Sequence, residues 1–158
     1  MIRRSLAIAL LALALPAAAQ SVPAGNFTDM WWNPAEDGWG ISFMQHDDRA
    51  FVVWYTYDPR EPDPRGQFKP LWIVMPGGRW TAPNTVTGQA YVFNGVPFFQ
   101  SGSNRSLNPV GTFTFTFSGL NDGTFRYDIA APAGLAPSDP AFNLPPMSGS
   151  RPITRLVY

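Results

Sequence analysis

The clearest strand pattern in the sequence is Val110-Gly111-Thr112-Phe113-Thr114-Phe115-Thr116-Phe117-Ser118. Three phenylalanines alternate with three threonines, which is the period-two pattern of a β-strand with one side facing a core and the other facing solvent. The alternation returns downstream at Phe125, Tyr127 and Ile129. We therefore expect two antiparallel strands whose aromatic sides point into the same core.

The length of the turn between these strands can be predicted, because an even or an odd number of loop residues decides which side chains lie opposite each other. A two-residue loop would place phenylalanines opposite charged side chains, whereas a three-residue loop places aromatic opposite aromatic. The segment Asn121-Asp122-Gly123 supplies a three-residue loop, with Gly123 in the left-handed conformation that such a hairpin needs. The register predicted from this loop pairs Phe117 with Tyr127 and Phe115 with Ile129.

Further segments show strand composition and are separated by turn residues. The expected strands cover residues 26–32, 41–46, 50–58, 69–75, 85–94, 110–118, 125–129 and 151–157. Their connections include a polar hairpin tip at Asp47-Asp48 and a proline-rich loop at residues 59–67. Three further turns are expected at Pro76-Gly77-Gly78, Asn94-Gly95 and Asn121-Asp122-Gly123. About eight strands joined by hairpins, with no helical pattern, predict an all-β antiparallel barrel-like fold of the up-and-down type.

The strand at residues 50–58 is apolar or aromatic on both sides. This composition favours a central position, with both sides covered or partly used. If the hairpin that follows folds symmetrically about residues 59–67, Trp54 faces Trp72 on the returning strand. An aromatic pair at that spacing contributes about 0.5–1 kcal/mol beyond burial.

The first nineteen residues have the pattern of a secretory signal. Arg3 and Arg4 precede an apolar run at residues 6–15, and Ala17-Ala18-Ala19 forms a small-residue cleavage site. The run is shorter than the roughly twenty residues that span a bilayer, and no other segment approaches that length. We expect residues 20–158 to be one exported domain without a membrane span, located in the periplasm or outside the cell.

Composition limits the partners and cofactors. Without Arg3 and Arg4, nine basic residues remain against eleven acidic ones, a formal charge of −2, so nothing favours nucleic acid or an anionic membrane. The chain has no cysteine, which excludes disulfides and thiolate metal sites. Export without cysteine is more typical of a bacterial protein than of a eukaryotic extracellular module. We expect no cofactor.

A second informative stretch is Met30-Trp31-Trp32-Asn33-Pro34-Ala35-Glu36-Asp37-Gly38-Trp39-Gly40, which holds three of the six tryptophans. Together with Trp54-Tyr55-Thr56-Tyr57-Asp58 and Pro70-Leu71-Trp72, it resembles uncharacterised secreted proteins of proteobacteria that carry a W-N-P-x-E-S-G-W-G motif. In those proteins a W-x-x-Y-D strand end and a second tryptophan follow. The resemblance implies export but no activity.

The chain departs from this pattern in two places. Asp37 stands where serine is usual, and the loop between Tyr57 and Trp72 is longer. Trp32-Asn33 also resembles, more faintly, the Trp-x-Asn of avidin. The chain has a similarly faint likeness to lipocalin barrels. That likeness implies an eight-stranded barrel.

Acidic residues offer one possible chemistry. Glu36 and Asp37 are neighbours, and sequence neighbours rarely supply the separation that glycosidase carboxylates need. We favour the interpretation that they accept N–H groups and hold the loop. The alternative function is a hydrolase of envelope or extracellular polymer, with Glu36 as the acid and Asp37 or Asp58 as its partner.

Metal binding and nucleophilic catalysis have weaker support. His46, Asp47 and Asp48 lie at a predicted hairpin tip, and no second nitrogen or sulfur ligand exists to complete a zinc site. The sequence has no Gly-x-Ser-x-Gly elbow for a serine nucleophile. We therefore predict no catalytic and no metal-binding residues.

The aromatic residues are the stronger signal for function. Tryptophan and tyrosine present flat apolar faces to sugar rings and other planar ligands, while their N–H and O–H groups bond outward. We predict a binding module for a small planar, glycan or apolar ligand at the barrel mouth, through Trp31, Trp39, Glu36, Trp54, Trp72 and Tyr55. A third hypothesis is a structural envelope or interaction protein whose aromatic face contacts another protein.

Overall fold

The computed structural model describes residues 21–94, 96–101, 104–105 and 108–157, and within these ranges it contains strands and no helix. The expected signal segment and Gly95 of one expected turn lie outside the described residues. The strands are β1 (Asp29–Trp32), β2 (Gly40–His46), β3 (Arg49–Tyr57), β4 (Pro70–Ala82), β5 (Thr85–Asn94), β6 (Asn104–Arg105), β7 (Gly111–Phe117), β8 (Asp122–Ile129) and β9 (Met147–Arg155).

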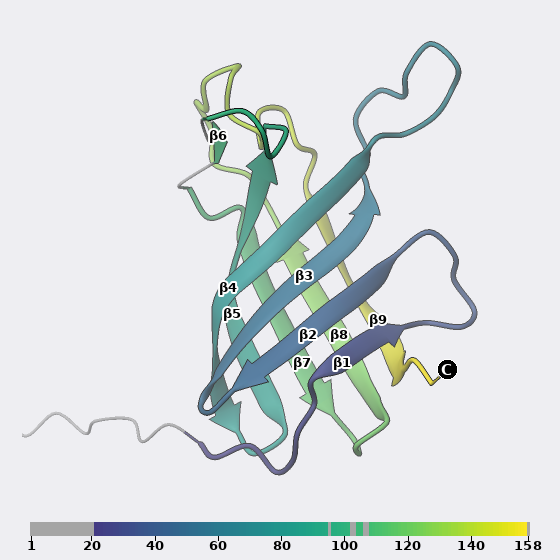
Figure 1. The fold of residues 1–158 in the computed structure, drawn as a ribbon, viewed down its shortest axis with the longest axis vertical. Coiled ribbons are helices and arrows are strands. Elements are labelled where there is room, and N and C mark those ends of the chain that lie inside the picture. Colours follow the sequence, from purple (N-terminus) through teal and green to yellow (C-terminus); the bar gives the residue numbers. More distant parts are fainter. Residues whose placement is uncertain (1–20, 95, 102–103, 106–107, 158) are drawn as a thin grey trace, which may run out of the picture.

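Eight of these strands close into an antiparallel barrel (Figure 1). Each pairs with the next along the chain, β5 pairs with β7 beyond the short β6, and β1 closes the ring by pairing with β9. The two-residue β6 pairs with the end of β5. The predicted all-β barrel of the up-and-down type is confirmed.

The barrel interior is a packed aromatic core. Its largest fully buried side chains include two tryptophans and five phenylalanines: Trp31, Trp80, Phe43, Phe113, Phe115, Phe117 and Phe125. The rings of Phe115 and Phe125 stack at 4.8 Å, and those of Phe27 and Phe117 at 4.0 Å. Each such side chain contributes about 1.5–3 kcal/mol through burial, so this core is the main source of stability.

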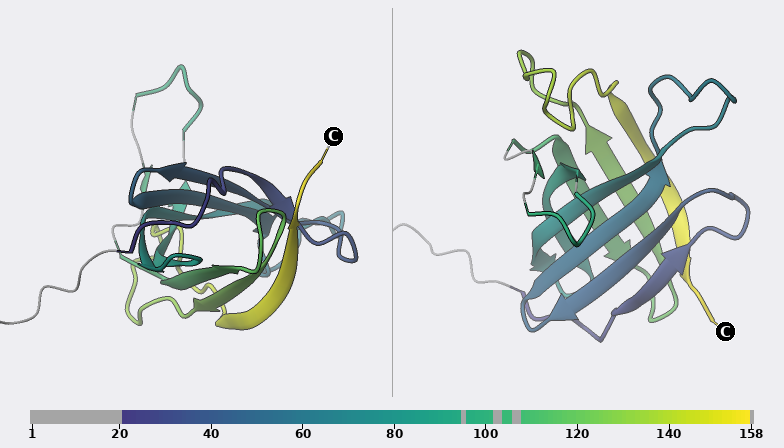
Figure 2. Two further views of the ribbon diagram at one scale, coloured as in Figure 1. Left: turned by 90° about the horizontal axis from the view of Figure 1, so that it is seen from below. Right: turned by 45° about the horizontal axis from the view of Figure 1, so that its top comes forward.

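The two ends of the barrel differ (Figures 1 and 2). At one end the connections β2–β3, β4–β5 and β7–β8 are short, and the segment before β1 packs Phe27 against Phe117 and Trp80. The opposite end carries longer loops, among them residues 33–39, 58–69 and 130–146. The last of these buries Ala141 and Leu144 in the core.

The register of the β3–β4 hairpin differs from the expected one by one residue. Tyr57 pairs with Pro70, so the intervening loop has an even number of residues, and Trp54 lies opposite Ile73 while Trp72 lies opposite Tyr55. A slip of one residue moves a side chain to the other face of the sheet. The expected Trp54–Trp72 pair is therefore wrong, because Trp54 points inward and Trp72 points outward.

The β7–β8 hairpin confirms the predicted parity but not the predicted register. Phe115 pairs with Phe125, and Phe117 pairs with Gly123 instead of Tyr127. The turn is made by residues 118–121, where the backbone N–H of Ser118 donates to the carbonyl oxygen of Asp122. Gly123 lies inside β8 and does not adopt the expected left-handed conformation.

The Pro76-Gly77-Gly78 segment does not end a strand. It lies within β4, where the register with β5 shifts between Val74 and Arg79. Proline cannot donate a ladder hydrogen bond, and such an irregularity accommodates it inside a strand. The chain reverses instead at Pro83-Asn84.

Candidate functional site

Exposed aromatic rings lie on the outer wall of the barrel, over β3 and β4. Side chains alternate along β3, so Trp54 enters the core while Tyr55 and Tyr57 face outward. Tyr55 is 37% exposed, Tyr57 54% and Trp72 56%. The rings of Tyr55 and Trp72 meet edge to face, with centroids 6.0 Å apart.

These rings surround a hollow of about 260 Å³, here called the aromatic hollow. Its lining combines four aromatic rings with small residues from three segments: Trp39, Tyr55, Tyr57, Trp72, Gly38, Gly40, Thr56 and Pro70. Gly38 has a φ of +85°, and a β-carbon there would lie 3.5 Å from the Tyr57 ring. The β1–β2 loop therefore approaches Tyr57 closely enough to form one wall.

Trp39 is held in place by polar contacts behind the hollow. Its indole Nε1–H donates to Glu36 Oε2 at 3.0 Å, and Glu36 Oε1 lies 3.2 Å from Nε of Arg151 on β9. The indole also packs against the core near Phe125, with centroids 6.4 Å apart. The loop is braced at its start by Asn33, whose Oδ1 accepts the Ala35 N–H at 3.0 Å.

The structure separates the six residues expected at the barrel mouth. Tyr55, Trp72 and Trp39 line the aromatic hollow, and Glu36 supports Trp39 from behind. Trp31 and Trp54 lie in the core, with exposures of 0% and 7%. Of the residues expected together at the mouth, Trp31 and Trp54 are thus buried, whereas Trp39 and Glu36 are partly exposed, and binding at the mouth stays a prediction.

The indoles of Trp31 and Trp54 differ in their hydrogen bonding. Nε1–H of Trp31 donates to the carbonyl oxygen of Phe27 at 3.0 Å. Nε1–H of Trp54 has no acceptor among the described residues.

Two residues that line the aromatic hollow, Tyr57 and Pro70, were not among those predicted from the sequence. Period-two alternation along β3 could have found Tyr57, because it puts Tyr55 and Tyr57 on the same side. Pro70 carries no comparable signal, since its position follows from pairing with Tyr57 at the loop end.

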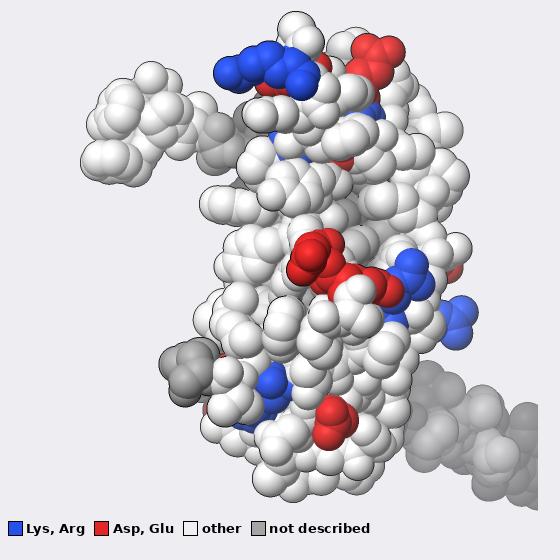
Figure 3. Space-filling model, turned by 90° about the vertical axis from the view of Figure 1, so that its right-hand side faces the viewer, with Lys and Arg blue, Asp and Glu red and all other residues white. Residues whose placement is uncertain are grey.

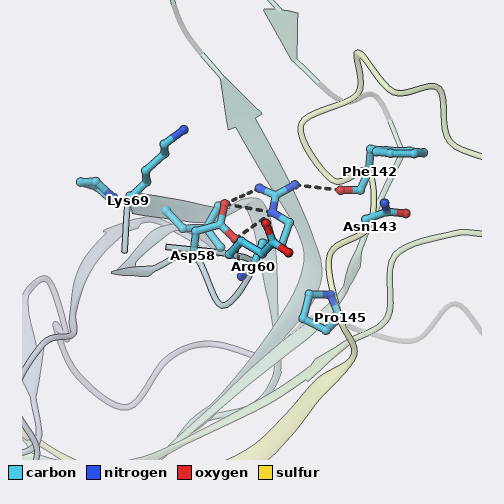
Figure 4. Close-up of a pocket in the computed structure, with 9 residues that line it drawn as sticks. Asp58, Arg60, Lys69, Phe142, Asn143 and Pro145 are labelled. Carbon is cyan, nitrogen blue, oxygen red and sulfur yellow. Dashed lines mark hydrogen bonds and ion pairs between the residues drawn. The ribbon is translucent and has the colours of Figure 1, made fainter. Parts of the chain in front are cut away.

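A larger hollow of about 730 Å³ lies at the long-loop end and is here called the polar hollow (Figure 4). It is lined by residues of the β3–β4 and β8–β9 loops and by the start of β4: Asp58, Arg60, Glu61, Lys69, Pro70, Leu71, Phe142, Asn143 and Pro145. Lys69 lies on one side of the Asp58–Arg60 pair, and Phe142 and Asn143 lie on the other.

Arg60 joins the two loops. Its Nε donates to both carboxylate oxygens of Asp58, at 2.7 and 2.9 Å, and its Nη1 donates to the carbonyl oxygens of Pro140 and Phe142, at 3.0 and 2.8 Å. A planar guanidinium can make all these bonds at once, whereas an ammonium cannot. Arg60 is thus a structural clamp.

The same clamp sets the ionisation of Asp58. Partial burial acts to raise the pKa of its carboxyl group, but the side-chain and backbone hydrogen bonds from Arg60 and the charges of Arg60 and Lys69 outweigh burial. The pKa of Asp58 therefore lies below its usual value of 3.8. A carboxyl with a lowered pKa is ionised at neutral pH and is poorly suited to act as a proton donor.

The other polar candidates are engaged locally or exposed. Glu36 bonds Trp39 and Arg151, and Asp37 is exposed. His46 lies 3.4 Å from Asp47 at the β2–β3 turn, with its side chain 94% exposed. Among the described residues no group of three or more histidine, aspartate or glutamate side chains could hold a metal ion.

Charged side chains are sparse on the face that carries the β1–β2 loop. They form small mixed groups, and most of the surface between them is uncharged (Figure 3). In the part of the chain that the structure describes, no helix is long and apolar enough to cross a membrane.

Comparison with known proteins adds no relative, because no family model, no curated protein and no solved structure matches this chain.

Proposed function

We propose that this chain is an exported binding module for a planar or glycan ligand, which it holds in the aromatic hollow on its outer wall. The observation that carries the proposal is the convergence of Trp39, Tyr55, Tyr57 and Trp72 from two strands and a loop around one hollow. These rings present apolar faces, and their polar edges can bond to a ligand's hydroxyl groups.

The scaffold supports this function in two ways. The hydrophobic core fills the interior of the barrel, so a ligand can reach aromatic rings only where they are exposed on its outer surface. Trp39 is held by Glu36, and the rings of Tyr55 and Trp72 contact each other on paired strands, so these contacts reduce the side-chain freedom that ligand binding would remove. A hydrolase has less support, because Glu36 and Asp58 are each paired with an arginine.

Tryptophan fluorescence and calorimetric titration of residues 20–158 test the proposal. The ligand panel contains soluble mono- and oligosaccharides and planar aromatic compounds. Trp72→Ala and Tyr57→Ala should each weaken binding about tenfold, which corresponds to about 1.4 kcal/mol. Phe51→Ala is the matched control, because Phe51 is an exposed aromatic of β3 outside the hollow. Equal binding by wild type and Trp72→Ala would contradict the proposal.

A second candidate function is binding to another protein. Phe98 and Phe99 are 99% and 74% exposed, and their segment, residues 96–101, stands away from the barrel (Figure 2). Exposed apolar side chains that project in this way are typical of interaction sites. Sedimentation velocity of the chain tests whether that protein is a second copy: association should be abolished by Phe98→Ser with Phe99→Ser, and a concentration-independent monomer argues against self-association through these side chains.

A further inference from the structure

The aromatic hollow and the polar hollow adjoin at Pro70, which lines both. Tyr57 of the first hollow directly precedes Asp58 of the second, and Tyr57 pairs with Pro70 across the hairpin. The backbone N–H of Asp58 donates to the carbonyl oxygen of Lys69 at 2.8 Å, which holds the two chain segments together at this boundary. A ligand that leaves the aromatic hollow over Pro70 therefore enters the polar hollow.

The polar hollow offers both donors and acceptors to such a ligand. The Asp58–Arg60 pair is engaged internally, as described above, whereas Lys69, Glu61 and Asn143 are exposed along the lining. One cation and one anion remain outside the clamped pair, so the lining has no net charge. This balance suits a neutral ligand with many hydroxyl groups more than an anion or a cation.

The backbone at the boundary between the two hollows is held in a fixed conformation. Pro70 has a fixed φ and no backbone N–H, and Arg60 binds the β3–β4 loop to the carbonyl oxygens of the β8–β9 loop. Both walls of the polar hollow are therefore held in place before a ligand arrives. A preformed site lowers the ordering cost of binding.

We infer that the ligand of this module is a neutral oligosaccharide that stacks one sugar on Trp72 and Tyr57 and extends across Pro70 into the polar hollow. The inference rests on the proposed function of the aromatic hollow. A single planar aromatic ligand would use only the first hollow, and an apolar chain would meet the ammonium and carboxylate groups of the second. Linked sugars supply an apolar ring face for one hollow and hydroxyl groups for the other.

Calorimetric titration with oligosaccharide series of increasing length tests the inference. The probes are β-linked glucose oligomers and N-acetylglucosamine oligomers of one to six units. Affinity should rise by about tenfold or more between the shortest bound member and a longer one, as additional sugars reach the polar hollow. It should change less than about twofold between low and high salt, because a neutral ligand releases few counterions.

Variants in the polar hollow test whether its residues cause the gain in affinity with oligosaccharide length. Asn143 has a φ of +57°, so Asn143→Gly removes its amide and keeps the backbone conformation. Combined with Lys69→Ala, it should remove the gain with length and leave the affinity for the shortest member unchanged. Arg65→Ala is the control, because Arg65 lies in the same loop outside the hollow, with its side chain 81% exposed.

The outcomes separate this inference from the proposed function. If affinity is independent of length but still depends on Trp72, the extension into the polar hollow is overturned and the aromatic site stands. The same holds if only planar aromatic compounds bind, or if the gain with length survives in the double variant. If neither sugars nor planar compounds bind, both are overturned.

Discussion

At Gly111 the backbone leaves no room for a side chain. Its φ is +154°, which L-residues rarely adopt, and a β-carbon there would overlap the carbonyl oxygen of Asp128 on β8. Gly111→Ala should therefore lower the free energy of unfolding by about 3 kcal/mol or more, measured by urea denaturation. Gly119→Ala is the control, because a β-carbon at Gly119 would meet nothing within 4 Å beyond its two chain neighbours. Equal stability of the two variants would show that the strand start at Gly111 is not strained.

The tryptophans should divide into two classes by their effect on stability. Trp72 is 56% exposed and contacts Tyr55, so Trp72→Ala should cost about 1 kcal/mol or less. Trp31 is fully buried, and Trp31→Ala should cost about 3–5 kcal/mol. Urea denaturation of both variants measures the difference. A large loss in Trp72→Ala would mean that its ring serves the fold and is not free for a ligand.

For single residues, the sequence indicates the aromatic candidates but does not orient all of them. Alternation in residues 50–58 predicts that neighbours point to opposite sides, yet both sides are aromatic. Composition therefore does not say whether Trp54 or Tyr55 faces the core. The orientation follows from the β3–β4 register, and a one-residue error there put Trp54 and Trp72 on the same face of the sheet, whereas the structure puts them on opposite faces.

Two loops of the long-loop end are joined by Asp58 and Arg60, and this joint should depend on pH. The pKa of Asp58 lies below its usual value of 3.8, so the ionised carboxylate stabilises the fold above that pH, and this contribution is lost as the pH falls through the folded-state pKa. Asp58→Asn should cost about 1.5–3 kcal/mol at pH 7, the range for hydrogen bonds to charged groups.

The difference between wild type and Asp58→Asn should shrink as the pH falls below about 4, because the carboxyl of the unfolded chain takes up a proton there, and it should vanish once the folded-state carboxyl is protonated as well. Urea denaturation at pH 7, 4 and 3 measures it. A difference that stays constant over this range would show that the charge of Asp58 does not stabilise the joint between the loops.

At the element scale, hydrophobic pattern predicts strands and their inner sides better than turns. The phenylalanines of β7 and the aromatic residues of β8 were correctly expected to face each other. The turn was not correctly expected, because residues 118–123 hold two glycines and three turn-forming polar residues and so permit several loops that pair the same faces of the two strands. The turn expected at Pro76-Gly77-Gly78 was wrong for a similar reason, because a bulge inside β4 uses the same residue types that make a turn elsewhere.

At the scale of the whole molecule, closure of the barrel decides where ligands can reach aromatic rings. Sequence composition predicted the barrel and the excess of aromatic residues, but it could not say which rings are buried. The closed barrel fills its interior with Trp31, Trp54 and their neighbours, which leaves Tyr55, Tyr57 and Trp72 outside. That division depends on the packing of all eight strands together, which no single segment of sequence contains.

Closure itself depends on the seam between β1 and β9, which the guanidinium of Arg155 reinforces. Its nitrogens donate to the carbonyl oxygens of Leu120 and Asn26, at 2.8 and 3.0 Å, and to Asp29 Oδ2 at 3.0 Å. The guanidinium carbon also lies 5.2 Å from the centroid of the buried Trp31 ring. One side chain thus ties the last strand to the first strand, to the segment before it and to the β7–β8 turn.

Arg155→Lys keeps the charge but loses the planar fork, so it should lower the free energy of unfolding by about 2 kcal/mol or more. Hydrogen exchange should accelerate first at the amides of β1, because this four-residue strand joins β9 through only a short ladder, while β7 and β8 keep their protection. Arg65→Lys, at a largely exposed arginine, should change neither quantity. If Arg155→Lys unfolds at the wild-type urea concentration with β1 still protected, the barrel is closed by strand pairing and core packing without this clamp.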